Sequence, residues 1–211
     1  MDENLPDERP QRRREYSGPA ATFGLAALVI AVVALGVWYF EIRADGGGAE
    51  REPGLGIVAL DDALNPTDRA PAAKVGRAAP SFRLRNIDGS ITTLADLRGR
   101  YVLVNFWASW CPPCRGETPD LQAFHEARAP GLVVVGVNQQ ESLQTASAFV
   151  QQFEVTYPVV LDVDGQVSDA YHVGTGLPIS FVVDPEGVIQ RVLFGRITRE
   201  DLAELAAEFR F

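Results

Sequence analysis

The sequence is poor in the residues that build metal sites and disulfide frameworks. Its 211 residues include two cysteines, two histidines and one methionine. No second C-x-x-C or H-x-x-H pair accompanies Cys111 and Cys114, and His125 and His172 lie far apart, which disfavours a zinc site. A structural disulfide between residues so close in sequence would close almost no loop and would stabilise little. We therefore expect a redox-active pair, with no metal and no cofactor.

Basic clusters are also scarce. The formal net charge is −9, and no basic cluster occurs outside the N-terminus. This balance argues against nucleic acid as a partner. The sequence contains no internal repeat. Its apolar content of 46% is ordinary for a globular protein with one membrane segment, and its length allows one domain with a sizeable core plus extra segments.

One long stretch lacks charge altogether. From Tyr16 to Phe40 no residue is charged, and residues 20–40 are almost wholly apolar. At 1.5 Å per residue this run crosses a bilayer core of about 30 Å. Trp38 and Tyr39 stand at its far end, where interfacial aromatic residues belong, and four arginines between residues 9 and 14 favour a cytoplasmic N-terminus. A cleaved signal peptide is the alternative, although its apolar region would span only 7–15 residues.

These features divide the chain into four parts. We predict a cytoplasmic tail at residues 1–18, a transmembrane helix at 19–40, an extracytoplasmic linker at 41–74 and a folded domain at 75–211. Three consecutive glycines at 46–48 and three prolines interrupt any periodicity in the linker. Residues 55–64 within it are apolar enough for a short docked element. The expected location is the cell membrane, single-pass, with the domain on the extracytoplasmic side.

The folded domain is organised around the stretch from Trp107 to Cys114, W-A-S-W-C-P-P-C. An apolar run at residues 101–106 predicts a buried strand just before it, and helical spacing at 117–128 follows. Both cysteines should therefore lie on the first turn of a helix, whose dipole and free N–H groups lower the pKa of a thiol. This arrangement favours Cys111 as the nucleophile, more exposed than Cys114, and Cys114 as the resolving cysteine.

The order of the remaining elements predicts the fold class. Strands and helices alternate along the domain, which then ends in a strand hairpin and a last helix. This order predicts an α/β protein with a thioredoxin fold, in which helices flank a central mixed sheet. An extra N-terminal β-hairpin around Asp88-Gly89 precedes it, after the one transmembrane helix. The expected strands are 81–84, 91–93, 100–107, 132–138, 157–161, 179–184 and 188–194, and the expected helices are 117–128, 141–153, a turn at 167–171, and one from Thr198, with Asp201 at its N3 position, to 209.

The segment from Asn105 to Pro119, N-F-W-A-S-W-C-P-P-C-R-G-E-T-P, together with the distant G-L-P ending at Pro178, resembles the TlpA/ResA-like thioredoxins. Roughly residues 75–211 share the resemblance. It implies a membrane-anchored, extracytoplasmic thiol-disulfide oxidoreductase that reduces client protein disulfides. Clients of this kind include apocytochrome c and copper-site proteins, and the implied electron donor is a membrane protein of the CcdA type. Ile179 departs from the Gly-x-Pro-Glu of thioredoxins dedicated to cytochrome c, which puts that client in doubt.

The resemblance also assigns roles around the cysteines. It implies that the peptide bond before Pro178 is cis and that this proline packs beside the dithiol. Leu177 would then offer its backbone N–H and C=O to an extended substrate. Trp110 and Pro112 would contribute to the substrate-binding surface, and Trp107 would belong to the core.

An acid near the cysteines completes the predicted site. Glu117 lies three residues after Cys114, where the resembled family has a glutamate, and burial would make it a proton carrier for Cys114. The alternative is a first-turn acid that only complements the helix dipole. Asn105 replaces the buried aspartate of ordinary thioredoxins and cannot shuttle a proton. His125 and His172 are expected to be surface residues.

Two other functions stay open as alternatives. A thiol peroxidase would require P-x-x-x-[ST]-x-x-C, but Val104 and Ala108 occupy the first two positions of that pattern. A non-enzymatic copper-binding module could use Cys111, Cys114 and His172, although such modules usually carry C-x-x-x-C.

Overall fold

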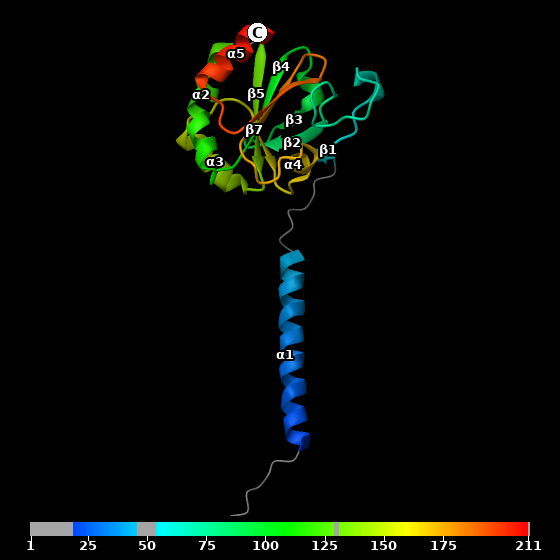
Figure 1. Ribbon diagram of the computed structural model, residues 1–211. Coiled ribbons are helices and arrows are strands. Elements are labelled where there is room, and N and C mark those ends of the chain that lie inside the picture. Colours follow the sequence, from blue (N-terminus) through cyan, green and yellow to red (C-terminus); the bar gives the residue numbers. More distant parts are fainter. Residues whose placement is uncertain (1–18, 46–53, 129–130, 211) are drawn as a thin grey trace, which may run out of the picture. The chain divides into compact units, whose positions relative to one another are not determined.

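The structure is a computed structural model that describes residues 19–45, 54–128 and 131–210 (Figure 1). It separates into two units, residues 1–48 and 49–211. In the first unit the described residues form one helix, α1 (Pro19–Asp45), with exposed apolar side chains between Leu28 and Tyr39. Within the described parts of the chain, none of the helices meets the length and apolarity that a membrane span requires. The segment expected at residues 19–40 lies within α1, and the expected tail at 1–18 lies outside the described residues.

The second unit is built on one mixed sheet, as the sequence predicts. Its strands run in the order β1-β2-β6-β5-β4-β7-β8, and β3 pairs with β2 outside this path. The strands are β1 (Gly56–Ile57), β2 (Phe82–Asn86), β3 (Ile91–Thr93), β4 (Tyr101–Trp107), β5 (Leu132–Gln139), β6 (Val159–Asp162), β7 (Ile179–Val183) and β8 (Ile189–Phe194). The helices are α2 (Pro112–Arg128), α3 (Leu143–Gln152), α4 (Gln166–Ala170) and α5 (Arg199–Phe209), with short 3₁₀ turns η1 (Asp62–Leu64) and η2 (Leu94–Leu97).

Alternation along β4 assigns its side chains to two separate cores. Val102, Val104 and Phe106 pack in one hydrophobic cluster with α4 and η2. Leu103 and Trp107 pack in the other, beneath α2, α3 and α5. Because side chains of a strand point alternately to opposite faces, position 105 faces the α2 side as well. The polar side chain of Asn105 is thus directed into an apolar layer beneath α2.

Strand direction gathers the site at one edge of the sheet. β4, β5 and β6 are mutually parallel, and β8 runs in the same direction because β7 is antiparallel to both β4 and β8. The carboxyl ends of these strands therefore meet at one edge, where loops carry binding and catalytic residues in open α/β sheets. The loop between β4 and α2, which contains Cys111, lies at this edge, and Cys114 follows on the first turn of α2.

Helix starts follow the expected capping chemistry. The Ser142 side chain accepts a hydrogen bond from the Thr145 amide and begins α3. Thr198 and Asp201 form a reciprocal capping box at the start of α5. α2 begins at Pro112, where the missing N–H costs nothing. The α2 helix thus starts five residues before the apolar spacing of 117–128 alone predicts.

Part of the segment predicted as a linker is paired with the domain. β1 lies antiparallel to β2, and the Val58 amide donates to the Ser81 carbonyl at 3.0 Å. Arg98 donates to the Leu64 carbonyl at 2.5 Å and also to the Glu186 carbonyl. Residues 56–64 are therefore held by backbone pairing and by one arginine. This is the docked element that the apolar residues at 55–64 suggested.

Candidate active site

The two cysteines form a disulfide at the N-terminal end of α2. Their Cα atoms are 5.3 Å apart, and the Cys114 amide donates to the Cys111 sulfur at 3.2 Å. Cys111 immediately precedes the helix, and its carbonyl accepts from the Arg115 amide. The Cys111 sulfur thus lies at the positive end of the helix dipole, with a backbone N–H directed at it. This environment stabilises a thiolate at Cys111 once the bond is reduced.

Exposure separates the two cysteines less than the sequence suggests. In this oxidised form Cys111 is 2% exposed and Cys114 is 0% exposed. The prediction that Cys111 is the more exposed therefore holds only by a small margin. The N-terminal position of Cys111 and the amide at its sulfur distinguish the two residues more clearly than exposure does.

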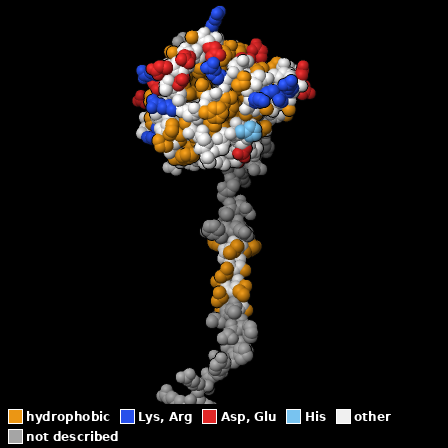
Figure 2. All heavy atoms as spheres, viewed as in Figure 1, with side chains coloured by type: hydrophobic (Ala, Val, Ile, Leu, Met, Phe, Trp, Pro, Cys, Tyr) orange, Lys and Arg blue, Asp and Glu red, His pale blue; other side chains and the backbone are white. Residues whose placement is uncertain are grey.

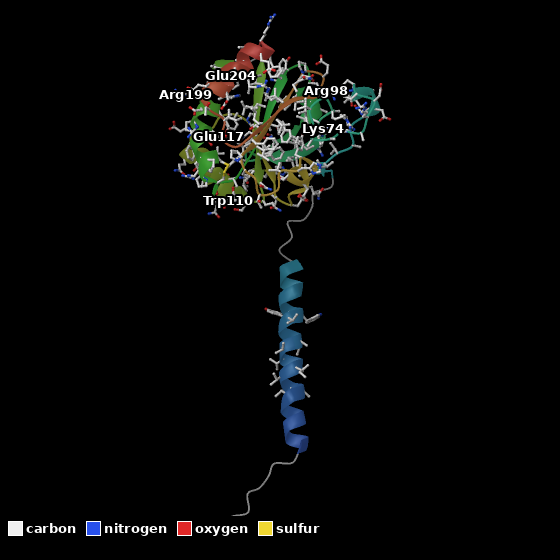
Figure 3. All side chains as sticks on the ribbon, in the orientation of Figure 1. Lys74, Arg98, Trp110, Glu117, Arg199 and Glu204 are labelled. Carbon is white, nitrogen blue, oxygen red and sulfur yellow. A yellow bond between two sulfur atoms is a disulfide. The ribbon has the colours of Figure 1, made fainter. Side chains whose placement is uncertain are left out.

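The two tryptophans beside the cysteines have opposite environments. Trp107 is buried against Phe149, with ring centroids 4.3 Å apart, as expected for a core residue. Trp110 is 62% exposed and projects from the domain in Figure 3. Pro112 is also exposed. Trp110 and Pro112 thus offer an exposed apolar surface next to the disulfide.

The loop that carries Trp110 is held by an acid that the sequence analysis did not single out. Glu141 accepts from the Ser109 amide at 2.8 Å and from the Ser109 hydroxyl at 2.5 Å. It also accepts from the Asn138 side chain at 2.7 Å. Ser109 and Glu141 are 32 residues apart in sequence, and only the parallel pairing of β4 with β5 brings them together. No spacing rule links them.

The peptide bond between Leu177 and Pro178 is cis, as the resemblance implies. Pro178 is buried, and its carbonyl accepts from the Gly195 amide at 2.9 Å. Leu177 is half-buried and packs against both cores. Among the described residues, no hydrogen bond joins the Leu177 backbone N–H or C=O to another backbone group. Both groups are therefore free to pair with an extended peptide.

Glu117 is the buried acid of the site, 1% exposed on α2 one turn after Cys114. Its Oε1 atom accepts from the Asn105 side-chain amide and its Oε2 atom from the Ile197 amide, each at 2.8 Å. Asn105 also donates to the Ser180 hydroxyl at 2.9 Å. Burial raises the pKa of Glu117 to about 7, against the opposing effects of the Ile197 and Asn105 hydrogen bonds and of the Arg196 charge. Glu117 can therefore both hold and release a proton near neutral pH.

The structure places the two histidines differently from each other. His172 is exposed, as predicted. His125 is half-buried, with its ring 5.9 Å from the Tyr157 ring in an edge-on arrangement. The expectation of a surface residue was therefore wrong for His125, because its helix packs this position against the segment before β6. Burial lowers the pKa of His125. No group of three possible metal ligands occurs within the described ranges.

The surface of the second unit carries charges of both signs. On the face shown in Figure 2, basic and acidic side chains alternate with hydrophobic ones, and no single-sign stripe crosses this face. Nucleic-acid-binding surfaces concentrate basic residues in such stripes. The face in view carries no such stripe.

Comparison with known proteins points to one chemistry. The profile of the AhpC/TSA family matches residues 75–192. The thiol-disulfide oxidoreductase ResA of Bacillus subtilis is 40% identical over 124 residues, covering 58% of this chain and 69% of the relative. The sporulation thiol-disulfide oxidoreductase A of the same organism is 33% identical over 159 residues, covering 73% and 92%. A thioredoxin-family thiol:disulfide interchange protein of Chlorobium tepidum has a solved structure that superposes with a TM-score of 0.57 at 30% identity, covering 67% and 97%.

Proposed function

The chain belongs to the AhpC/TSA family, and from this premise we propose that it is a thiol-disulfide oxidoreductase that reduces client disulfides through Cys111 and Cys114. The observation that carries the proposal is the disulfide at the start of α2, with the Cys114 amide at the Cys111 sulfur. Two relatives named thiol-disulfide oxidoreductases support the same chemistry. The reaction uses no cofactor beyond the two sulfurs.

The first step is an attack by the Cys111 thiolate on a client disulfide. A bond forms between Cys111 and one client sulfur, the client S–S bond breaks, and the other client sulfur leaves as a thiolate that takes up a proton. The helix dipole and the Cys114 amide stabilise the thiolate before the attack. The client segment lies along Leu177, whose free backbone groups align it, with Trp110 and Pro112 as its apolar support.

The second step resolves the mixed disulfide. Cys114 loses its proton and attacks the Cys111 sulfur, forming the disulfide seen here and releasing the second client sulfur as a thiolate. Two electrons have then passed to the client. Glu117, one turn along α2 and with its pKa raised to about 7 by burial, is the proposed acceptor of the Cys114 proton. Cys111, Cys114, Glu117 and Pro178 are thus the proposed catalytic residues.

A trapping experiment tests these roles. With Cys114→Ser, the first step proceeds and the second cannot, so a mixed disulfide between Cys111 and the client should accumulate on non-reducing gels. Mass spectrometry of the trapped species would identify clients of either proposed class, apocytochrome c or copper-site proteins. Trapping by Cys111→Ser instead would reverse the assignment of nucleophile and resolving cysteine.

We further propose that residues 19–40 anchor the enzyme in the cell membrane, with the catalytic unit on the extracytoplasmic side. The uncharged run from Tyr16 to Phe40 and the arginines before it support this location. A membrane protein of the CcdA type is the proposed electron donor, as the resemblance implies. After a carbonate wash the protein should stay with the membranes, and its release into the soluble fraction would contradict the anchor.

A peroxidase has less support. Peroxiredoxin chemistry needs a hydroxyl three residues before the reactive cysteine. The residue at that position is Ala108, which is buried and has no hydroxyl. A copper module would need His172 to join the cysteines, and no such three-ligand group occurs in the described part of the chain.

A further inference from the structure

The segment between β8 and α5, residues 195–198, contacts two different parts of the site. The Gly195 amide donates to the Pro178 carbonyl at 2.9 Å, and the Ile197 amide donates to Glu117 at 2.8 Å. Gly195 has a φ of +81°, a conformation that glycine adopts without the cost that a Cβ atom imposes. The turn at Gly195 thus directs the next amides towards the acid on α2.

Arg196, between these two amides, lies against α2 itself. A Cβ atom added at Gly116 would come within 3.2 Å of Arg196 Nη1 and 3.3 Å of its Cζ atom. The guanidinium therefore packs over Gly116, which has no side chain. Its Nη2 atom lies 3.6 Å from Asp120 Oδ2, and the Arg196 side chain is 51% exposed.

Arg199 offers a natural comparison. It contacts the same carboxylate, with its Nε atom 2.5 Å from Asp120 Oδ1, and it carries the same charge. It sits on the first turn of α5, whereas the three atoms nearest to an added Cβ at Gly116 all belong to Arg196. The two arginines thus share Asp120 but differ in their relation to Glu117.

We propose that Arg196 is a positioning residue for Glu117: its contact with Gly116 and Asp120 holds the Ile197 amide on the Glu117 carboxylate and sets a positive charge beside that carboxylate. The inference rests on the proposed function, in which Glu117 accepts the proton of Cys114. Arg196 does not touch the reacting sulfurs. It acts through Glu117 by fixing the carboxylate in place and by favouring its ionised form.

The groups around Glu117 make Arg196 the relevant charge. β4 contributes Asn105, which is neutral, and through it Ser180 of β7. Tyr157 approaches from the segment before β6, and burial, followed by the Glu117 charge, raises its pKa, so it stays neutral. On α2 itself lie Cys114, bridged in this form, and Asp120, which is paired with Arg196 and Arg199. Arg196 is the charged group whose effect opposes burial at Glu117.

The test measures the titration of Glu117 directly. The oxidised full-length protein is labelled with ¹³C at glutamate side-chain carboxyls, and the Glu117 signal is assigned by its loss in Glu117→Gln. Because the bridged cysteines do not titrate, the midpoint near neutral pH belongs to the acid. Arg196→Ala should raise this midpoint by about half a unit to one unit, since a nearby positive charge has been removed. Arg199→Ala should leave it within about 0.2 unit, since Arg196 and not Arg199 is the charge that acts on the acid.

Two further variants separate charge from packing. Arg196→Lys keeps the positive charge, so the pH midpoint of Glu117 in this variant should lie close to that of the unaltered protein. Gly116→Ala forces the guanidinium away by a few tenths of an ångström and should shift the midpoint in the same direction as Arg196→Ala, by a smaller amount. The shift in Arg196→Ala should shrink at high salt, because an exposed charge is screened. A purely structural role of Arg196 would not depend on salt.

The rate of the resolving step provides the second readout. With a synthetic disulfide peptide as client, the pH midpoint for release of the mixed disulfide should move in Arg196→Ala by the same amount as the NMR midpoint. Equal NMR midpoints in Arg196→Ala and Arg199→Ala would overturn the inference, and so would an NMR shift without a shift in the rate profile. If the unaltered protein does not reduce the peptide at all, the proposed function fails instead.

Discussion

The side-chain amide of Asn105 donates to the carboxylate of Glu117 at 2.8 Å, across the boundary between β4 and α2. Asn105, which cannot carry a proton, thus holds in place Glu117, which can. Asn105 and Glu117 lie 12 positions apart, and both side chains are buried. The contact joins the two side chains into one hydrogen-bonded pair, in which Asn105 of β4 supplies the donor and Glu117 of α2 supplies the acid.

Glu117 should make the stability of the protein fall as the pH rises. Its pKa is raised by burial to about 7, so the folded state binds a proton that the unfolded state has already lost. The stabilisation is complete below the unfolded pKa of about 4.5 and is lost as the pH rises through about 7. The loss amounts to about 3 kcal/mol. Urea unfolding between pH 4.5 and 8 should show this slope in the unaltered protein, and Glu117→Gln should reduce it, leaving the part that other buried acids such as Asp162 contribute.

Asn105→Asp should place a second buried acid against Glu117. Two carboxyls in hydrogen-bond contact cannot both ionise at low cost, so the pKa of one of them rises further. The variant should therefore lose more stability at pH 8 than at pH 5, relative to the unaltered protein. Urea unfolding at the two pH values tests this, and an equal loss at both would mean that the two side chains have moved apart.

Gly136→Ala should destabilise the core near the site. A Cβ atom at this position of β5 would lie 2.9 Å from Trp107 Nε1 and 3.1 Å from a ring carbon of Tyr157. Both rings are buried, so the strain should cost about 1–3 kcal/mol in the free energy of unfolding. Gly176→Ala is the matched control, because its added Cβ atom would meet its nearest neighbours at 3.6 Å and 3.9 Å, in ordinary contact. A loss of similar size in the control would contradict the packing argument.

Thr198→Ala should weaken the start of α5. The Thr198 hydroxyl caps the Asp201 amide, and Asp201 returns a bond to the Thr198 amide. Losing the cap should cost about 1 kcal/mol. Thermal unfolding would detect it as a lowered Tm. Ser147→Ala, within α3, removes a hydroxyl from a helix interior and should not lower the Tm.

The reduction potential should identify the direction of electron flow. The scale runs from about −270 mV for thioredoxin to about −120 mV for DsbA. As a reductant, this protein should lie near the thioredoxin end when equilibrated in a thiol buffer series. A value near the other end would keep the dithiol chemistry but make the protein an oxidant, and a CcdA-type electron donor would then be unnecessary.

The sheet and its helices could be predicted because local signals were strong. The apolar runs before Trp107 and after residue 131, the Asp88-Gly89 turn and the cap at Thr198 each specify a short piece of structure without help from distant residues. The order of those pieces, with the C-x-x-C motif at a strand-to-helix junction, was sufficient for the fold class.

The contacts within the site could not be predicted in the same way. Glu141 with Ser109, and the Ile197 amide with Glu117, join residues 32 and 80 positions apart. Such pairs depend on which loops meet at one sheet edge, and no local pattern records that. His125 shows the same limit, because helical spacing did not reveal that Tyr157 from another segment would cover it. Gly116 and Gly136 mark two of the close approaches, because a Cβ atom there would meet Arg196 and Trp107.

The position of β4 in the sheet has a consequence for hydrogen exchange. β4 pairs along its length with β5 on one side and with β7 on the other, whereas β1, β3 and β8 occupy the outer positions. Local fraying begins at outer strands and leaves central ones until the whole unit opens. The amides of Val102 to Phe106 should thus be among the last to exchange with deuterium. Cys111 follows the end of this strand by four residues. The start of α2 is therefore attached to the slowest-exchanging strand, and the sulfur geometry should persist while the outer strands open and close.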